Sequence, residues 1–103
     1  MKAGPEKHRV QPPSARTVRR ACRRELYRTV KRLGRHVPDD LFRQAETLYV
    51  RKVIDHLPWI VEHQNDRRRL ADWWEEQVSG EIAALWNVDR RRLADAFRDA
   101  FGG

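Results

Sequence analysis

Cysteine, lysine and long apolar runs are scarce in this chain of 103 residues, and each scarcity excludes a class of protein. Cys22 is the single cysteine, so no disulfide can form within the chain and a disulfide scaffold is excluded. No apolar run approaches the roughly 20 residues that a membrane-spanning helix needs. Residues 1–20 also lack the apolar centre of a secretory signal, so a secreted protein is not expected.

Acidic residues are outnumbered, and the basic excess is nearly all arginine. The chain carries 22 basic and 15 acidic residues, a net charge of +7. Such a surface attracts nucleic acid, anionic lipid or an acidic protein. Arginine suits carboxylates and phosphates alike because its planar guanidinium binds either through two parallel hydrogen bonds. Charge alone therefore leaves the class of partner open.

Strand signals are missing, whereas helical spacing is present almost throughout. There is little strict alternation of polar and apolar residues, and no Asn-Gly or Asp-Gly hairpin turn. Residues 1–13 are polar, basic and interrupted by proline, so we expect a disordered basic tail. Residues 14–103 are expected to form a single all-α domain, an antiparallel three-helix bundle with a short C-terminal fourth helix.

Capping residues and breakers divide this domain. Ser14 can cap the first helix, which Gly34 should end. The second helix should begin at Pro38 and end before Pro58. Residues 59–65 are too apolar for a free loop; they predict either a short turn of helix or the continuation of a helix kinked at Pro58. A third helix should begin at Asp66 and run past Gly80, and a last one at Asp89. Its apolar positions would be Leu93, Phe97, Ala100 and Phe101.

A short repeat also lies in this half of the chain. The heptapeptide at residues 66–72, Asp-Arg-Arg-Arg-Leu-Ala-Asp, recurs at residues 89–95. Two copies at this spacing do not indicate a solenoid. We interpret them as one helix start used twice, in which aspartate caps the helix.

Candidates for catalysis or metal binding are few. The four histidines show no zinc-finger or HExxH spacing, and no glycine-rich phosphate loop is present. Cys22, Ser14 and Ser79 lie in no recognisable nucleophile motif, so we predict neither an enzyme nor a bound cofactor. A group of acids on the third predicted helix is expected to pair with nearby arginines on the same helix. That group is Asp72, Glu75, Glu76 and Glu81.

The basic first helix makes nucleic-acid binding an alternative function. Its many arginines can track phosphates, and the break at residues 34–40 allows a helix-turn-helix. However, the arginines surround most of that helix instead of forming one stripe. Asp39 and Asp40 also begin the next helix, where a recognition helix needs hydrogen-bond donors.

An ordered set of landmarks runs through residues 22–82. It comprises Leu26-Tyr27-Arg28, Leu33, Arg35, Pro38, Leu41, Glu46, Tyr49-Val50-Arg51 and Trp74-Glu75. In this set the chain resembles the LYR-motif proteins, most of all the succinate dehydrogenase assembly factor 3 branch. The arginine-rich, lysine-poor composition is similar to that of a high-GC bacterial chain, so a bacterial relative is considered.

The resemblance implies an adaptor or assembly chaperone, not an enzyme. Proteins of this family bind acyl carrier protein or help to mature an iron–sulfur enzyme subunit. By position, the partner-binding residues would be Leu26, Tyr27, Arg28, Lys31, Arg35 and Arg51. Leu26 would line the core or an acyl-chain tunnel, and Arg28 and Arg51 would grip an acidic helix. The expected location is cytoplasmic for a bacterial chain and the mitochondrial matrix for a eukaryotic one. A small accessory subunit of an enzyme is a further alternative.

Overall fold

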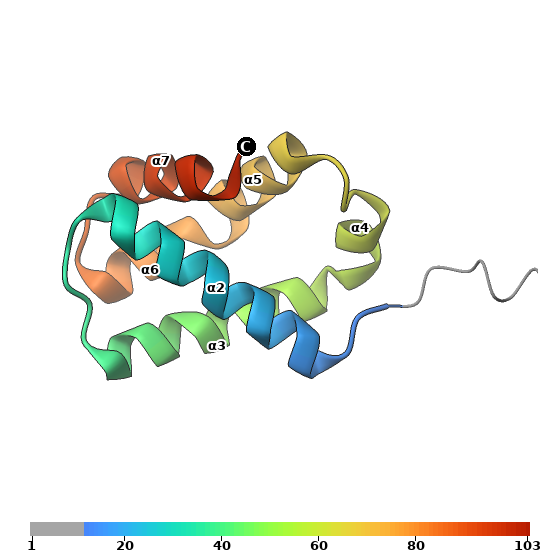
Figure 1. The fold of residues 1–103 in the computed structure, drawn as a ribbon, viewed down its shortest axis with the longest axis horizontal. Helices are drawn as coiled ribbons and strands as arrows, with labels where there is room; N and C mark the ends of the chain where they lie inside the picture. Colours follow the sequence, from blue (N-terminus) through green and yellow to red (C-terminus); the bar gives the residue numbers. More distant parts are fainter. Residues whose placement is uncertain (1–11) are drawn as a thin grey trace, which may run out of the picture.

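The computed structural model describes residues 12–103, and within that range the chain is entirely helical and loop. Six helices follow one another (Figure 1). They are α2 (Ala15–Leu33), α3 (Asp39–Asp55), α4 (Leu57–Glu62), α5 (Arg67–Gln77), α6 (Ser79–Trp86) and α7 (Arg90–Phe101). The all-α class is therefore confirmed, whereas the expected three helices plus a short fourth is wrong in number. The predicted tail at residues 1–13 lies outside the described range except for Pro12 and Pro13.

The predicted helix ends are set by their capping residues. Ser14 Oγ accepts a hydrogen bond from Thr17 N at 3.2 Å, and Gly34 ends α2 with φ at +68°. A positive φ is a conformation in which glycine has no Cβ to clash. α2 therefore begins and ends where the sequence predicts.

The repeated heptapeptide is a helix start in both copies. Asp66 Oδ1 accepts from Arg69 N at 3.0 Å, and Asp89 Oδ2 accepts from Arg92 N at 2.9 Å. This confirms the interpretation as two helix N-termini.

The first arginine of each copy reaches across to the other helix. Arg67 Nη1 donates to Phe101 O at 3.0 Å, near the end of α7. Arg90 Nη2 donates to Glu75 O at 3.0 Å, near the end of α5. The two helices therefore run antiparallel, and each start helps to satisfy carbonyls at the other's end.

The expected third helix is broken at Val78 into α5 and α6. Ser79 Oγ donates to Glu75 O at 2.6 Å, and Arg90 donates to the same carbonyl. Side-chain bonds of this kind compete with the backbone hydrogen bonds of a helix, and Ser-Gly pairs are common kink sites. Ser79 and Gly80 thus explain a break that apolar spacing alone does not reveal.

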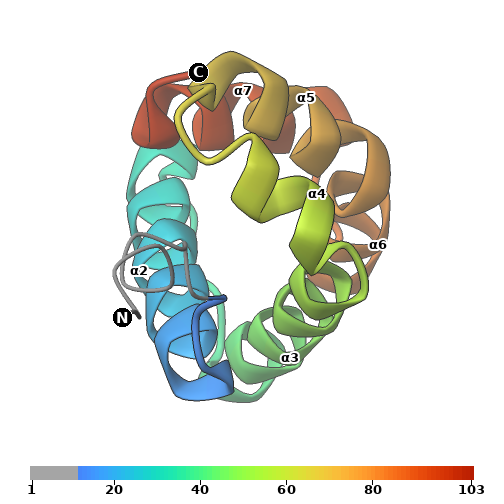
Figure 2. The same cartoon turned by 90° about the vertical axis from the view of Figure 1, so that its right-hand side faces the viewer.

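Of residues 59–65, which the sequence left open, residues 59–62 belong to the short helix α4, which starts at Leu57; α3 therefore ends at Asp55, before the expected end at Pro58. His56 ends α3, and its φ of −118° separates the two helices. Figure 2 shows α4 at the near end of the molecule, beyond the end of α3. None of its residues is fully buried, so α4 closes the end of the fold without entering the centre of the core.

The core lies between α2, α3, α5, α6 and α7. Trp74 and Phe97 stack with ring centroids 3.9 Å apart, and the Tyr49 ring meets both edge-on at 6.1 and 6.3 Å. Leu26 is fully buried beneath them in α2. The most extensive helix contact is between α2 and α7, so the last helix is integral to the core.

Candidate functional site

A cationic stripe runs along the outward face of α2. Its residues recur three or four apart, which places them on one side of a helix. They are Arg20, Arg24, Tyr27, Arg28 and Lys31, and all are exposed. They line one open groove of about 330 Å³, together with Arg23. Within residues 12–103 none of the four cations in the stripe takes part in an ion pair.

Three arginines that flank this face are occupied, whereas Arg16, one turn before Arg20, is exposed and makes no ion pair within residues 12–103. Arg19 Nη1 lies 3.0 Å from Glu46 Oε2, and Arg23 Nε lies 3.0 Å from Glu46 Oε1. On the other side of α2, Arg32 Nε pairs with Asp99 Oδ2 of α7 at 2.9 Å. Hence two sides of α2 are used for packing, and the stripe between them is left for solvent or a partner.

Glu46 is the one buried acid among the described residues, with 2% of its surface exposed. Desolvation raises its pKa, but hydrogen bonds from Arg23 and Arg19 outweigh this and leave the pKa below its ordinary value of 4.5. The carboxylate is therefore ionised at neutral pH and binds both arginines to α3. Because Arg23 also lines the groove, Glu46 fixes one wall of the candidate site.

Tyr27 forms the centre of the site. Its ring stacks on Phe42 of α3 with centroids 4.5 Å apart, yet 57% of its surface stays exposed. Phe42 in turn stacks near Trp86, whose Nε1 donates to Leu41 O at 3.1 Å. A large exposed aromatic held by a rigid stack is well suited to contact a partner, because little conformational freedom is lost on binding.

A second groove of about 260 Å³ adjoins the first at Tyr27. It shares Arg23 and Tyr27 with the first groove and adds side chains from the start of α3. Those side chains are Asp39, Phe42, Arg43 and Glu46. The two grooves differ sharply in charge: the first holds five cations and no acid, and the second holds two arginines and two acids.

Three of the six predicted partner-binding residues meet in the first groove. They are Tyr27, Arg28 and Lys31. Leu26 is fully buried, in agreement with its place on the apolar stripe of α2. Arg35 is exposed in the loop after α2 and lines neither groove.

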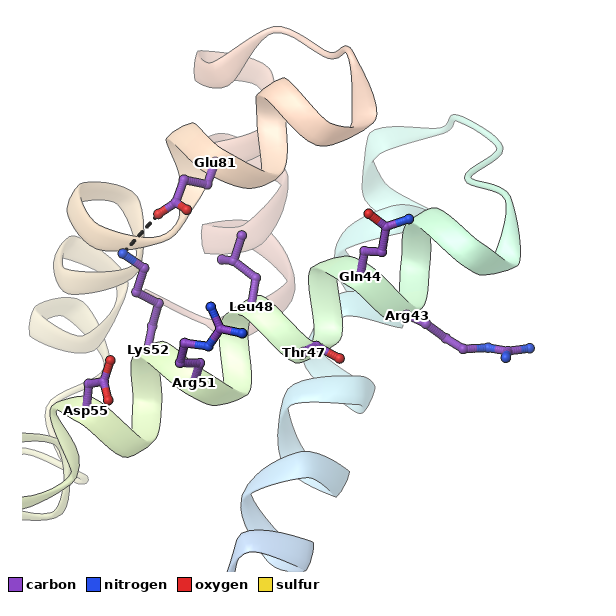
Figure 3. A pocket seen from close by; sticks show the side chains of 8 residues that line it. All are labelled: Arg43, Gln44, Thr47, Leu48, Arg51, Lys52, Asp55 and Glu81. Atoms are coloured by element: carbon purple, nitrogen blue, oxygen red, sulfur yellow. Dashed lines mark ion pairs between the residues drawn. The ribbon is translucent and has the colours of Figure 1, made fainter.

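Arg51 lies elsewhere, in a third groove of about 530 Å³ along α3 and α6 (Figure 3). There it neighbours Lys52, whose Nζ pairs with Glu81 Oε1 at 2.9 Å. The structure therefore does not bring Arg28 and Arg51 into one groove. Arg43, which lines the second groove, is the cation of α3 that lies beside the Tyr27 site.

The acids of the predicted third helix were expected to pair with arginines of the same helix, and this is wrong for Asp72, Glu75 and Glu81. Glu75 pairs with Arg91 at 2.8 Å and with Arg98 at 3.1 Å, both on α7. Asp72 also binds Arg98, and Glu81 binds Lys52 of α3. These acids join helices to one another, so they belong to the fold and offer no acid–base pair.

The side chains that could react or bind a metal lie outside these two grooves. Burial, together with the nearby Glu25 and Glu46, raises the pKa of the Cys22 thiol to about 12, so no thiolate nucleophile is present at neutral pH. Among residues 12–103 no three His, Cys, Asp or Glu side chains are placed to hold a metal ion. Trp74 and Trp86 are buried, whereas Trp59 and Trp73 are half-buried beside His56 in a groove of about 340 Å³.

The predicted partner-binding set omits seven residues that line the two grooves: Arg20, Arg24, Arg23, Asp39, Phe42, Arg43 and Glu46. The first two were visible as cations at spacings of four from Arg28, on the side of the helix opposite Val18, Cys22 and Leu26. The arginines of α2 as a whole lie on several sides of the helix, as expected, because Arg19 and Arg23 face α3 and Arg32 faces α7. No sequence signal pointed to Asp39 and Arg43, because their place beside Tyr27 depends on how α3 packs.

The chain matches no protein-family model, no curated protein and no solved structure. Across the part of the chain that the structure describes, no helix is both long and apolar enough to cross a membrane.

Proposed function

We propose that this chain is a small helical adaptor that binds an acidic helix of a partner protein through the cationic stripe of α2. The observation that carries the proposal is the stripe's lack of ion pairs within residues 12–103, while Arg19, Arg23 and Arg32 beside it are all engaged. Unpaired cations at helical spacing match carboxylates at the same spacing on another helix. Their aliphatic stems and the exposed Tyr27 ring supply apolar contact area.

The resemblance to LYR-motif proteins supports a particular kind of partner. Tyr27 and Arg28 belong to the tripeptide that carries the resemblance, and both line the groove. We therefore propose an acyl carrier protein, or an iron–sulfur enzyme subunit, as the acidic partner. The adaptor would then assist the maturation or assembly of a metabolic complex, without catalysing a reaction itself.

The direct test is titration calorimetry of the chain with a purified holo acyl carrier protein at low ionic strength. Wild type is expected to bind with an affinity that weakens as salt is added, because exposed charges are screened. Arg28→Glu replaces an attraction by a repulsion and should weaken binding by roughly tenfold or more. Absence of binding by wild type to both this protein and an iron–sulfur subunit would contradict the proposal.

Arg68→Glu is the matched control. Arg68 is an exposed arginine near the start of α5, has no ion pair within residues 12–103, and lies outside the grooves of α2. The substitution changes the net charge by the same amount as Arg28→Glu. It should leave the affinity within about twofold of wild type, since distant charges contribute little at moderate salt. An equal loss for both variants would indicate a response to net charge alone.

Nucleic-acid binding is the second candidate, and the single-faced stripe favours it. Four cations along one side of α2 can follow a phosphate backbone. Electrophoretic mobility shifts with a short DNA duplex over a salt series distinguish the candidates. Tight binding of the duplex at physiological salt, together with no protein partner, would select this alternative.

A further inference from the structure

The two grooves that meet at Tyr27 differ in how they treat an anion. The first groove presents only cations, so carboxylates and phosphates are both attracted to it. In the second groove Arg23 is already bound to Glu46, with Nη2 to Oε2 at 3.1 Å. Arg43 and Asp39 remain, one of each sign. The part of an anion bound beyond Tyr27 therefore meets a surface of nearly balanced charge, whereas the part bound along α2 meets only positive charge.

Asp39 is the acid exposed at this boundary. It begins α3, lies one turn before Phe42, and lines the groove next to the Tyr27–Phe42 stack. Within residues 12–103 it has no ion pair, and Arg43, four residues further along α3, is the cation that shares its groove. Asp40 follows it in the same helical turn, is also exposed, and lines neither groove.

We propose that Asp39 determines which polyanions the site accepts. It repels a continuous polyanion, such as a nucleic-acid backbone, that runs along α2 and past Tyr27. It tolerates a protein helix, because carboxylates on a helix are discrete and a neutral or basic residue can face Asp39. This inference rests on the proposed function, since it takes the cationic stripe as the partner-binding surface.

The physical reason is the regular spacing of charge in a nucleic acid. A duplex carries a phosphate at every step, so it cannot omit the charge that would face Asp39. A protein interface gains specificity from such a repulsive element as much as from attractive contacts. Asp39 would thus convert a surface that attracts any anion into one that prefers protein.

The test compares Asp39→Lys with Asp40→Lys in binding to a short mixed-sequence DNA duplex at low salt. Both variants change the net charge equally and alter the same end of α3, so helix-dipole and long-range effects cancel. Removing a repulsion and adding an attraction near the groove should make Asp39→Lys bind the duplex about five- to tenfold tighter than Asp40→Lys. Circular dichroism and thermal unfolding check that both variants keep the fold.

The inference would be overturned if the two variants bound the duplex with equal affinity. It would also be overturned if neither variant bound the duplex detectably. Either result leaves the acyl carrier protein titration untouched, so it does not decide the proposed function. Conversely, an adaptor that fails to bind any acidic protein can still show the difference between Asp39→Lys and Asp40→Lys. The two failures are therefore distinguishable.

Discussion

Arginines in two regions of this molecule differ in whether they bond to the rest of the protein. Between α5 and α7, Arg67, Arg90, Arg91 and Arg98 all cross from one helix to the other. Arg91 and Arg98 bind Glu75, and the Arg67 guanidinium also lies 4.4 Å from the centre of the Phe101 ring. Along the outer face of α2, by contrast, Arg20, Arg24 and Arg28 make no ion pair within the described residues.

The difference shows that a basic composition is not by itself a sign of binding. Arg91 and Arg98 are paired because acids of α5 face them across the helix contact, whereas Arg67 and Arg90 donate to backbone carbonyls of the facing helix. The α2 stripe faces solvent, where a lone surface charge contributes almost nothing to stability. Cations that the fold does not use and that lie together in one groove are therefore the ones to assign to a partner.

The largest expected effect comes from the apolar centre of the paired region. Phe97→Ala removes the ring that stacks on Trp74 at 3.9 Å and contacts Tyr49. Truncating a buried phenylalanine typically costs about 3–5 kcal/mol, so the free energy of unfolding in urea should fall by that amount. A loss below about 1 kcal/mol, the scale of a surface substitution, would contradict an integral role for α7.

A smaller effect is expected at Glu46, the buried acid that pairs with Arg19 and Arg23 beside the stripe. Glu46→Gln keeps the shape of the side chain but removes charge-assisted bonds to Arg19 and Arg23, and should lower the free energy of unfolding by about 1–3 kcal/mol at pH 7. Asp99→Asn, which weakens an exposed pair with Arg32, is the control and should cost less than about 1 kcal/mol.

The Glu46 effect should also depend on pH in one direction. The folded pKa of Glu46 lies below the ordinary value of 4.5, so its contribution is complete above that pH. It is lost as the pH falls through the lower folded pKa, where the carboxyl is protonated in both states. Urea unfolding at descending pH should therefore show the wild-type and Glu46→Gln curves converging. A constant gap between them would contradict the ion pairs described here.

The smallest effect on stability is expected at the stripe itself. Replacing Arg24 and Arg28 together by glutamine removes two exposed charges that make no ion pair within residues 12–103. The free energy of unfolding should change by no more than about 0.5 kcal/mol. The same double variant should lose affinity for the acidic partner, as Arg28→Glu does. A marked loss of stability would show that the stripe serves the fold instead.

Much of the helical architecture was predictable because its signals are local. The caps at Ser14, Asp66 and Asp89 and the stop at Gly34 depend on a few neighbouring residues. The break at Val78 was not predictable, because Arg90, eleven residues beyond Ser79, takes part in it. The integral role of α7 was also missed, because apolar spacing predicts which face of a helix is buried but not which helix packs against it.

The candidate site divides in the same way. The helical spacing of Arg20, Arg24, Tyr27, Arg28 and Lys31 is fixed by the sequence, because a helix places residues three and four apart on one side. The resemblance to LYR-motif proteins added Arg35 and Arg51 to the predicted partner-binding residues, but both lie outside this groove in the structure.

By itself, the sequence determined the helical class, the helix starts at Ser14, Asp66 and Asp89, the stop at Gly34 and the apolar face of α2, all of which follow from periodicity and capping over a few residues. Only the tertiary structure decided which arginines are paired and which acid stands beside Tyr27. Those outcomes depend on distances between residues far apart in the chain, and ion pairs form only between side chains that packing brings within a few ångströms.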